Sequence, residues 1–388
     1  MNANMLIIHG GGPTAVINSS LYGVIAEAKK NAVIDKVYGA IGGTEAVFNE
    51  QFMDLKTLSD KQMALLLQTP ASAIGTSRYP LEQDDYGKML PILKKYNIKY
   101  VLLNGGNGTM DTCGKLSKVC KDEDIFVVGI PKTIDNDIAS TDHSPGYGSA
   151  AKYIATTISE IGADVKSLPI HVSIVEAMGR NAGWITAASA LARAKDGDAP
   201  HLIYLPEKPF DEIEFLEDVK RLHDKIGGVV VAVSEGLKGK DGKPIVPPIF
   251  QSGRATYYGD VSSYLCNLII KELGIKARSE KPGLSGRTSI ALQSSVDREE
   301  AILVGEVAVQ AVTEEKTGVM VGLKREEGSD YKITPILVPI AEVMMHERIV
   351  PDNFINERGN DVTKEFIDWC RPIIGEKMKE FIDLKATY

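Results

Sequence analysis

The sequence is poor in cysteine and has no cysteine pattern that would build a disulfide framework or a metal cluster. Its four cysteines, Cys113, Cys120, Cys266 and Cys370, form no CxxC pair and lie at no metal-ligand spacing from a histidine. We therefore expect reduced, mostly buried thiols, which are typical of proteins in the cytoplasm.

The sequence also lacks a long apolar run, a tandem repeat and an excess of positive charge. Its start, MNANMLIIHGGG, has no basic segment of the kind that opens a signal peptide, so we expect a protein that is neither exported nor inserted into a membrane. The 44 Lys+Arg residues face 52 Asp+Glu residues, a net charge of −8, which argues against a general affinity for nucleic acid or anionic membranes. The 388 residues exceed what one core usually holds, so two domains are expected.

What the sequence does contain is a recurring pattern of apolar run, glycine-rich or polar turn, and amphipathic helix. Five apolar runs, at 5–9, 100–104, 125–130, 170–175 and 227–236, are predicted as buried strands. This alternation predicts a parallel sheet covered by helices on both faces, with ligands beyond the carboxyl ends of the strands. We expect an exposed excursion at 237–248 and a functional or hinge loop at 280–289.

Two glycine loops follow predicted strands and precede predicted helices. The first, GGGPTA at 10–15, loosely matches a dinucleotide fingerprint, but no acidic residue ends a strand about 20 positions later, which argues against a nicotinamide cofactor. The second is NGGNGTMD at 104–111, where Thr109 could cap the helix or bond a phosphate oxygen. Either loop alone could be a tight turn. Together they predict a site for a polyphosphate.

The segment PKTIDND at 131–137 directly follows the strand predicted at 125–130. Asp135 and Asp137 are two residues apart, so in an extended segment they would share a side, and Lys132 adds a positive charge nearby. A base for a hydroxyl proton, a magnesium ligand and a cation for phosphate charge are what phosphoryl transfer requires. The alternative is a solvated turn rich in aspartate and asparagine. The position after a buried strand and the two glycine loops favour chemistry.

Other cations follow strands or lie in loops that contain glycine. Arg180 follows a strand and a glycine and is suited to bidentate contact with a sugar phosphate. Each of these residues alone is more often a surface charge, and a lone histidine is more often structural. The candidates are Arg78, His171, Arg180, Arg278, Lys281 and Arg287.

Taken together, the motifs resemble the phosphofructokinase family, and in their details its pyrophosphate-dependent branch. The segments GGPTAVIN, GGNGT, PKTIDND, EAMGRNAGWIT, SEG and KPGLSGR occur in the family's order, and the resemblance covers essentially the whole chain. It implies two Rossmann-like three-layer αβα domains with mostly parallel sheets and an active site in the cleft between them. The expected domains are 1–147 with about 287–338, which holds the phosphoryl donor, and 148–286 with about 339–388, which binds the sugar phosphate.

The resemblance further implies phosphoryl transfer to the 1-hydroxyl of fructose 6-phosphate with Mg²⁺ as cofactor. Asp135 matches the catalytic base, with Lys132 and Arg180 assisting, and Asp137 and Asn107 match the magnesium site. The donor phosphates are assigned to Gly11, Gly12, Arg78, Gly106, Gly108, Thr109 and Lys132. The sugar phosphate is assigned to Thr133, Asp135, His171, Met178, Gly179, Arg180, Glu235, Arg278, Lys281 and Arg287.

In the family, some phosphate ligands come from a neighbouring subunit. This places His171 and Arg278 at a shared site and implies a homodimer or homotetramer. The expected partners are therefore pyrophosphate, fructose 6-phosphate and further copies of the chain.

Several positions depart from the family pattern. Lys132 stands where the ATP-using branch has glycine, which favours pyrophosphate, whereas many pyrophosphate enzymes have aspartate where this chain has Gly108, which leaves room for ATP. Asn107 replaces an aspartate and removes one negative charge from the magnesium shell. Leu284 and His171 replace a histidine and an arginine of the bacterial ATP-type enzymes.

Two alternatives remain at this stage. The first is an ATP-dependent kinase of fructose 6-phosphate or of a relative such as sedoheptulose 7-phosphate, for which Gly108 is the main evidence. The second is a sugar-phosphate sensor without catalysis, suggested by Asn107 and the altered phosphate pocket. The retained Asp135 argues against a sensor, because a sensor has little need of a base.

Overall fold

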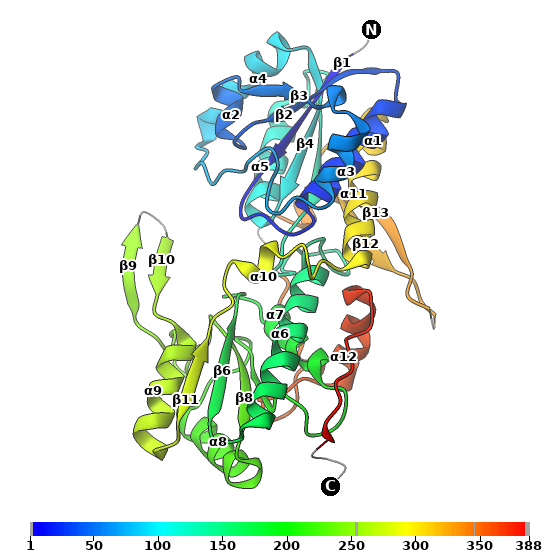
Figure 1. Ribbon diagram of the computed structural model, residues 1–388. Helices are drawn as coiled ribbons and strands as arrows, with labels where there is room; N and C mark the ends of the chain where they lie inside the picture. The colour runs from blue at the N-terminus through cyan, green and yellow to red at the C-terminus, as the bar shows by residue number, and fades with distance from the viewer. Residues whose placement is uncertain (1–2, 253–254, 329, 345, 385–388) are drawn as a thin grey trace. The chain divides into compact units, whose positions relative to one another are not determined.

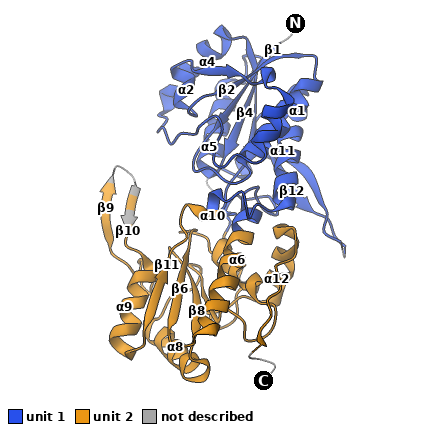
Figure 2. Ribbon diagram, viewed as in Figure 1, with its two compact units in different colours: residues 1–150, 287–348 blue, residues 151–286, 349–388 orange. Residues whose placement is uncertain are grey.

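The computed structural model describes residues 3–252, 255–328, 330–344 and 346–384, and these divide into two compact units. Unit 1 comprises residues 1–150 and 287–348, and unit 2 comprises residues 151–286 and 349–388 (Figure 2). The sequence placed 339–348 with the second domain, whereas these residues cluster with unit 1. Strand β13 ends at Pro339, and the turn that follows packs its apolar side chains into the core of unit 1. Among the described residues, no helix is both long and apolar enough to span a membrane.

Unit 1 is built on a seven-stranded sheet with the order β13-β12-β5-β4-β1-β2-β3 (Figure 1). Its five inner strands are parallel, and the two edge strands β3 and β13 are antiparallel to their neighbours. The strands are β1 (Ala3–His9), β2 (Ile34–Ala40), β3 (Phe52–Asp54), β4 (Ile98–Gly105), β5 (Phe126–Pro131), β12 (Val319–Arg325) and β13 (Ile333–Pro339). The helices are α1 (Ile17–Lys30), α2 (Glu45–Phe48), α3 (Asp60–Leu66), α4 (Gln83–Lys95), α5 (Asn107–Val119) and α11 (Ser295–Thr313), with short 3-10 turns at Leu55–Thr57 and Ile340–Glu342.

Apolar residues cover both faces of the unit 1 sheet, as the continuous apolar strands predict. Strand β1 shows the pattern: Met5 and Ile7 pack with α1 and α11 on one face, while Leu6 and Ile8 pack with α4 and α5 on the other. This arrangement is a three-layer αβα sandwich, and it confirms the predicted fold class. It also brings the carboxyl ends of β1, β4 and β5, which are neighbours in the sheet, to one edge.

Unit 2 contains a four-stranded parallel sheet with the order β11-β6-β8-β7 and a separate two-stranded hairpin, β9 and β10 (Figure 1). Its strands are β6 (Val172–Ala177), β7 (Leu202–Tyr204), β8 (Val229–Ser234), β9 (Pro248–Ser252), β10 (Ala255–Tyr258) and β11 (Ala277–Glu280). Its helices are α7 (Trp184–Ala188), α8 (Glu212–Ile226), α9 (Val261–Leu273) and α12 (Lys364–Cys370), with 3-10 turns at Ser189–Ala192, Asp352–Phe354 and Arg371–Ile374. Helix α6 (Tyr147–Ser167) continues from unit 1 into unit 2, and α10 (Ser285–Thr288) includes the second point at which the chain passes from one unit to the other.

Helices α8 and α9 bury their apolar sides with the strands of the unit 2 sheet. Helix α8 starts at an aspartate, Asp211, whose carboxylate accepts the N–H groups of Ile213 and Glu214, and it ends at Gly227 with φ of 74°. Helices α7 and α12 meet through an aromatic cluster around Trp184.

The segment 237–248 is only partly the exposed excursion that the sequence predicted. Lys240 and Lys243 extend into solvent, but Leu237 and Val246 are buried in the core of unit 2. The two buried side chains anchor the segment, which the density of glycine, proline and charge in the sequence did not indicate.

Candidate active site

Three of the predicted site segments converge at one edge of the unit 1 sheet. The first glycine loop follows β1, the second follows β4, and the segment 131–137 follows β5, and these three strands are neighbours. Backbone hydrogen bonds join the segments directly: Gly10 N donates to Asn104 O at 2.9 Å, and Lys132 N donates to Gly105 O at 3.0 Å. The sheet thus brings together three segments that the sequence assigned separately to the phosphoryl donor.

Lys132 links the third segment to the first glycine loop. Its Nζ donates to Gly10 O at 3.0 Å and to Gly12 O at 2.5 Å, and its side chain is 2% exposed. An ammonium group has three N–H donors, so one remains for an anion. Gly11, between these carbonyls, has φ of 75°, a conformation that favours glycine.

Burial lowers the pKa of Lys132 to about 8, Asp135 raises it, and the cations Arg287 and Arg78 lower it further. The amine is therefore mostly charged at neutral pH, and it carries that charge in a site nearly closed to water. A buried cation of this kind is stabilised when an anion binds beside it.

Two arginines lie at the same glycine loop. A Cβ added at Gly12 would lie 2.8 Å from Nη1 of Arg287 and 3.8 Å from Nη2 of Arg78. Arg78 reaches the loop because Gly11 N donates to Ser77 O at 3.0 Å and Thr76 Oγ1 donates to Gly11 O at 2.7 Å, which fastens its segment alongside the loop. The sequence assigned Arg287 to the sugar phosphate, but the structure places its guanidinium among the residues proposed for the donor.

The second glycine loop leads into α5, where Gly106 is the N-cap residue. Thr109 makes no side-chain cap bond; its side chain packs against Gly10 and Gly105 and leaves no space for a Cβ at either position. Of the two roles weighed for Thr109, capping is therefore wrong. At Gly108 an added Cβ would meet no atom within 4 Å, so the space above the start of the helix is open.

The segment that carries Asp135 and Asp137 does not have the extended conformation in which the two side chains would share a side. The chain bends there, and Asn136 has φ of 54°. Asp135 N donates to Thr133 Oγ1 at 3.1 Å, which closes a local turn. Asp135 nevertheless lies close enough to Lys132 and Arg287 for its charge to raise the pKa of both.

Asp137 and Asn107 are suited to holding a magnesium ion. Nδ2 of Asn107 donates to Asp137 O at 3.3 Å, and Oδ1 of Asn107 is buried without a hydrogen-bond partner. Burial raises the pKa of Asp137, and the nearby Glu347 raises it further. Within the described residues, no three His, Cys, Asp or Glu side chains form a ready-made metal cluster. One carboxylate and one amide oxygen fit Mg²⁺, which usually completes its shell with water and substrate phosphates.

Sequence reasoning missed Glu347 and Arg348. Glu347 bridges Ile138 by backbone pairing, and Arg348 N donates to Asp137 O at 2.8 Å. These residues lie 210 or so positions from the turn, and no local pattern marks them. The contact arises only from the folded chain.

In unit 2, four of the predicted residues gather at the carboxyl ends of β6 and β8. Gly179 N donates to Glu235 Oε1 at 3.2 Å, which holds Met178, Gly179 and Arg180 beside Glu235. Gly236 makes this approach possible, because a Cβ there would lie 1.7 Å from Arg180 O. The side chain of Arg180 extends to the hairpin, where Nη1 donates to Thr256 O at 3.1 Å and the guanidinium lies 5.3 Å from the ring centre of Tyr258.

The other predicted residues of unit 2 lie elsewhere. His171 precedes β6, and Arg278 on β11 pairs with Ser173, so both are at the amino end of the sheet. His171 is buried, and both burial and Arg278 lower its pKa. Lys281 forms ion pairs with Glu176 and Asp260, which offset its positive charge.

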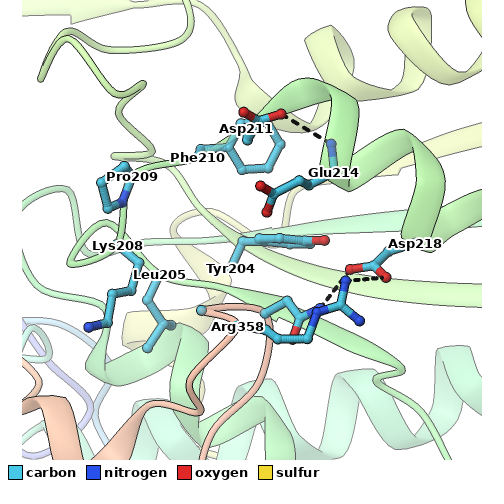
Figure 3. A pocket seen from close by; sticks show the side chains of 11 residues that line it. Tyr204, Leu205, Lys208, Pro209, Phe210, Asp211, Glu214, Asp218 and Arg358 are labelled. Atoms are coloured by element: carbon cyan, nitrogen blue, oxygen red, sulfur yellow. Dashed lines mark hydrogen bonds and ion pairs between the residues drawn. The ribbon is translucent and has the colours of Figure 1, made fainter.

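A polar pocket in unit 2 lies at the end of β7, next to α8 (Figure 3). Arg358 Nη2 donates to Asp218 Oδ1 at 3.0 Å, and Nδ2 of Asn360 donates to Asp218 Oδ2 at 2.6 Å. Asp218 thus attaches the segment around 358–360 to α8. The residues that line it include none of the predicted site residues.

The fold is thus a two-unit α/β protein in which the buried cation Lys132, the carboxylates Asp135 and Asp137, and the amide of Asn107 lie at one edge of the unit 1 sheet. Comparison with known proteins agrees: the family model described as Phosphofructokinase matches residues 4–312. The chain belongs to the phosphofructokinase family.

Individual relatives extend this result over the whole chain. It is 36% identical to a protein of Rhodospirillum rubrum named pyrophosphate–fructose 6-phosphate 1-phosphotransferase, covering 98% of this chain and 96% of that one. It is 31% identical to a protein of Alkalicoccus urumqiensis named sulfofructose kinase, covering 94% and 93%. The crystal structure of the pyrophosphate-dependent phosphofructokinase from Marinobacter aquaeolei matches with a TM-score of 0.89 and 32% identity, covering 98% of this chain and 94% of that one.

Proposed function

We propose that this protein transfers a phosphoryl group from pyrophosphate to the 1-hydroxyl of fructose 6-phosphate, giving fructose 1,6-bisphosphate and phosphate. The observation that carries the proposal is the placement of Lys132, a 2% exposed cation bonded to Gly10 O and Gly12 O and electrostatically coupled to Asp135. The relatives named for this reaction support it over the full length of the chain.

The residues of unit 1 divide the work of the transfer. Lys132, Arg78 and Arg287 compensate the charge of the pyrophosphate, and the N–H groups of the glycine loops bind its oxygens. Asp135 accepts the proton of the sugar hydroxyl as that oxygen attacks the nearer phosphorus, and the bond to the bridging oxygen breaks. A magnesium ion held by Asp137 and Asn107 would neutralise charge on the phosphates. Because pyrophosphate and the sugar 1-phosphate store comparable energy in the family, we expect a reversible reaction that serves glycolysis and gluconeogenesis.

In unit 2 we assign the sugar to Met178, Gly179, Arg180 and Glu235, which lie together. His171 and Arg278 lie at the other end of β6, a strand of six residues that spans roughly 20 Å. One copy of unit 2 cannot bring both groups to one small sugar phosphate. We therefore infer that His171 and Arg278 serve the site of a second copy, in a homodimer or homotetramer. The four buried cysteines form no disulfide, which fits a cytoplasmic setting.

A second acceptor has a specific observation in its favour. Among His171, Arg278 and Lys281, which the sequence assigned to the sugar phosphate, His171 has a lowered pKa and Lys281 is paired with two carboxylates, so Arg278 contributes most of the positive charge. A single cation suits a sulfonate monoanion as well as a phosphate. The relative named sulfofructose kinase supports this second acceptor.

Initial rates of the purified protein test donor and acceptor together. Pyrophosphate and ATP are each offered with Mg²⁺ and fructose 6-phosphate, and the sulfonate analogue of the sugar is compared under the better donor. We expect turnover with pyrophosphate and fructose 6-phosphate. Turnover with ATP but not with pyrophosphate would overturn the donor assignment. ATP is a meaningful competitor here, because the space at Gly108 is open. A higher kcat/KM for the sulfonate would change the acceptor.

A further inference from the structure

A buried histidine in unit 1 is held between two carboxylates close to the proposed site. Nδ1 of His143 lies 2.9 Å from Asp142 Oδ2, and Nε2 lies 2.6 Å from Glu300 Oε2. His143 is fully buried, and Glu300 is 7% exposed. A histidine flanked by carboxylates at both nitrogens is held as the cation with a fixed ring orientation.

The surrounding groups complete this cluster. Tyr331 donates to Glu300 Oε1 at 2.6 Å, and Arg325 Nη2 donates to Asp142 Oδ2 at 3.0 Å. The cations of His143 and Arg325 thus balance the carboxylates of Asp142 and Glu300. The cluster contains its own partners, so it needs no ligand.

The segment around His143 holds the turn that carries the two aspartates. Ser144 N donates to Asn136 Oδ1 at 3.0 Å, and Asn136 lies between Asp135 and Asp137 in the left-handed conformation. Thr133 N donates to Pro145 O at 3.2 Å. Displacement of the His143 segment would therefore move both carboxylates.

A second carboxylate of α11 acts on the same segment one turn earlier in the helix. Asp297 accepts Gly146 N at 2.7 Å, Ser149 N at 2.9 Å and Ser149 Oγ at 2.6 Å, and it is fully buried. Gly146 is in turn paired with Thr133 by a backbone bridge. Asp297 and Glu300, three residues apart on one helix face, thus hold the segment 142–149 at two points.

We propose that α11, through Glu300 and Asp297, positions the turn that places Asp135 and Asp137 at the phosphates. Glu300 and Asp297 are positioning residues, because they act through His143, Gly146 and Ser149. The proposal rests on the proposed function only in taking Asp135 and Asp137 as the groups that act on substrate and metal.

Stability alone is a weak reason for this cluster. A buried ion pair generally contributes little over well-packed apolar residues, whereas it fixes one geometry. Effective catalysis requires reacting groups to be placed within a fraction of an ångström, and a displacement of 1 Å can cost about 100-fold in rate. The hydrogen bonds run from α11 into the segment 142–149, which contacts the turn of Asp135 and Asp137. This arrangement fits a positioning role.

The test compares Glu300→Gln with Glu299→Gln in the full-length protein. Glu299 is the adjacent, exposed residue of α11, so the control makes the same chemical change outside the cluster. Steady-state kinetics gives kcat and KM, and amide hydrogen exchange is measured on peptides that cover 132–146.

For Glu300→Gln we expect kcat to fall about 10- to 100-fold with KM within about threefold, and exchange in 132–146 to quicken about tenfold. Glu299→Gln should match the parent protein in both. Should Glu300→Gln fail to fold, Tyr331→Phe removes one bond to Glu300 and should act in the same direction with smaller effect.

Each other outcome decides against the proposal. Equal kinetics and exchange in the two variants would remove Glu300 from any positioning role. A fall in kcat without faster exchange in 132–146 would show that the turn had not moved, and faster exchange throughout unit 1 would assign the cluster to general stability. If the parent protein transfers no phosphoryl group, the proposed function fails, and the exchange experiment alone still decides whether α11 holds the turn.

Discussion

The two units present their proposed site residues in different ways. In unit 1, residues from three separate motifs meet at one sheet edge, because β1, β4 and β5 are adjacent parallel strands. In unit 2, Glu235 and Arg180 lie at the carboxyl ends of the strands, whereas His171 and Arg278 lie at the amino ends. Unit 1 can therefore build its part of the site from one chain. We propose that unit 2 serves a sugar phosphate with all these residues only when more than one copy takes part.

The largest effect is expected from Asp135, at the centre of the unit 1 group. Asp135→Asn keeps the shape of the side chain but cannot accept the sugar proton. We expect kcat to fall about 1,000-fold, within the range that a general base contributes, while KM changes little. The matched control is Asp124→Asn, an exposed aspartate in a turn with φ of 52°, a conformation that asparagine tolerates. Retained turnover in Asp135→Asn would remove this carboxylate from the mechanism.

Lys132 comes next, because it joins two of the converging segments. Lys132→Met is expected to lower kcat/KM for pyrophosphate about 100-fold, through loss of the charge and of the bonds to Gly10 O and Gly12 O.

The pKa of Lys132 is lowered to about 8, so in the parent protein the KM for pyrophosphate should rise as pH increases through about 8. The Met variant should lack this rise. An equal pH dependence in both proteins would assign it to another group; Lys121→Met, at an exposed lysine, controls for the substitution itself.

Substitutions of Arg287 in unit 1 and Arg278 in unit 2 should affect the KM of different substrates. Arg287 lies at Gly12 in unit 1, so Arg287→Gln should raise the KM for pyrophosphate about tenfold and leave that for the sugar phosphate nearly unchanged. Arg278→Gln, in unit 2, should do the reverse. Initial-rate measurements with each substrate varied in turn give both constants. An effect of Arg287→Gln on the sugar phosphate alone would restore the assignment made from the sequence.

The smallest expected effect concerns stability rather than turnover. Burial opposes the charge of His143, but Glu300 and Asp142 outweigh it and raise its pKa to about 9, above the ordinary 6.5. The stabilisation from this cation is complete below pH 6.5 and is lost as pH rises through about 9. The melting temperature of the parent protein should therefore fall by a few degrees more than that of His143→Gln across this range. Parallel curves for the two proteins would show that His143 does not titrate there. The pKa of Asp297, about 6, places its titration below this range.

Residues adjacent in sequence account for most of what could be predicted. The runs at 5–9, 100–104 and 125–130 became β1, β4 and β5 within a few residues, because a strand buried on both faces needs a continuous apolar run. The fold class is confirmed on this basis, whereas the family is confirmed by the match of the family model to residues 4–312. The glycine loops and the segment 131–137 could be placed at one edge because each directly follows a strand.

Contacts distant in sequence could not be predicted. His143 and Glu300 are 157 positions apart, and no periodicity in α11 marks Glu300 as the partner of a histidine. The ion pairs of Lys281 and the placement of Arg287 depend on which strands and helices become neighbours. The segment 133–137 is not extended at Asn136, which has φ of 54° and whose side-chain oxygen accepts a hydrogen bond from Ser144 N, 8 positions later in the chain. The roles of the individual site residues remain predictions.

Phosphorus NMR of the parent protein with pyrophosphate, Mg²⁺ and fructose 6-phosphate tests the central claim most directly. The account predicts that the pyrophosphate signal declines while one phosphate and one new phosphate monoester on carbon 1 of the sugar appear in equal amounts, and that Asp135→Asn slows this change about 1,000-fold. Unaltered pyrophosphate, or its conversion to phosphate alone with the sugar untouched, would contradict it.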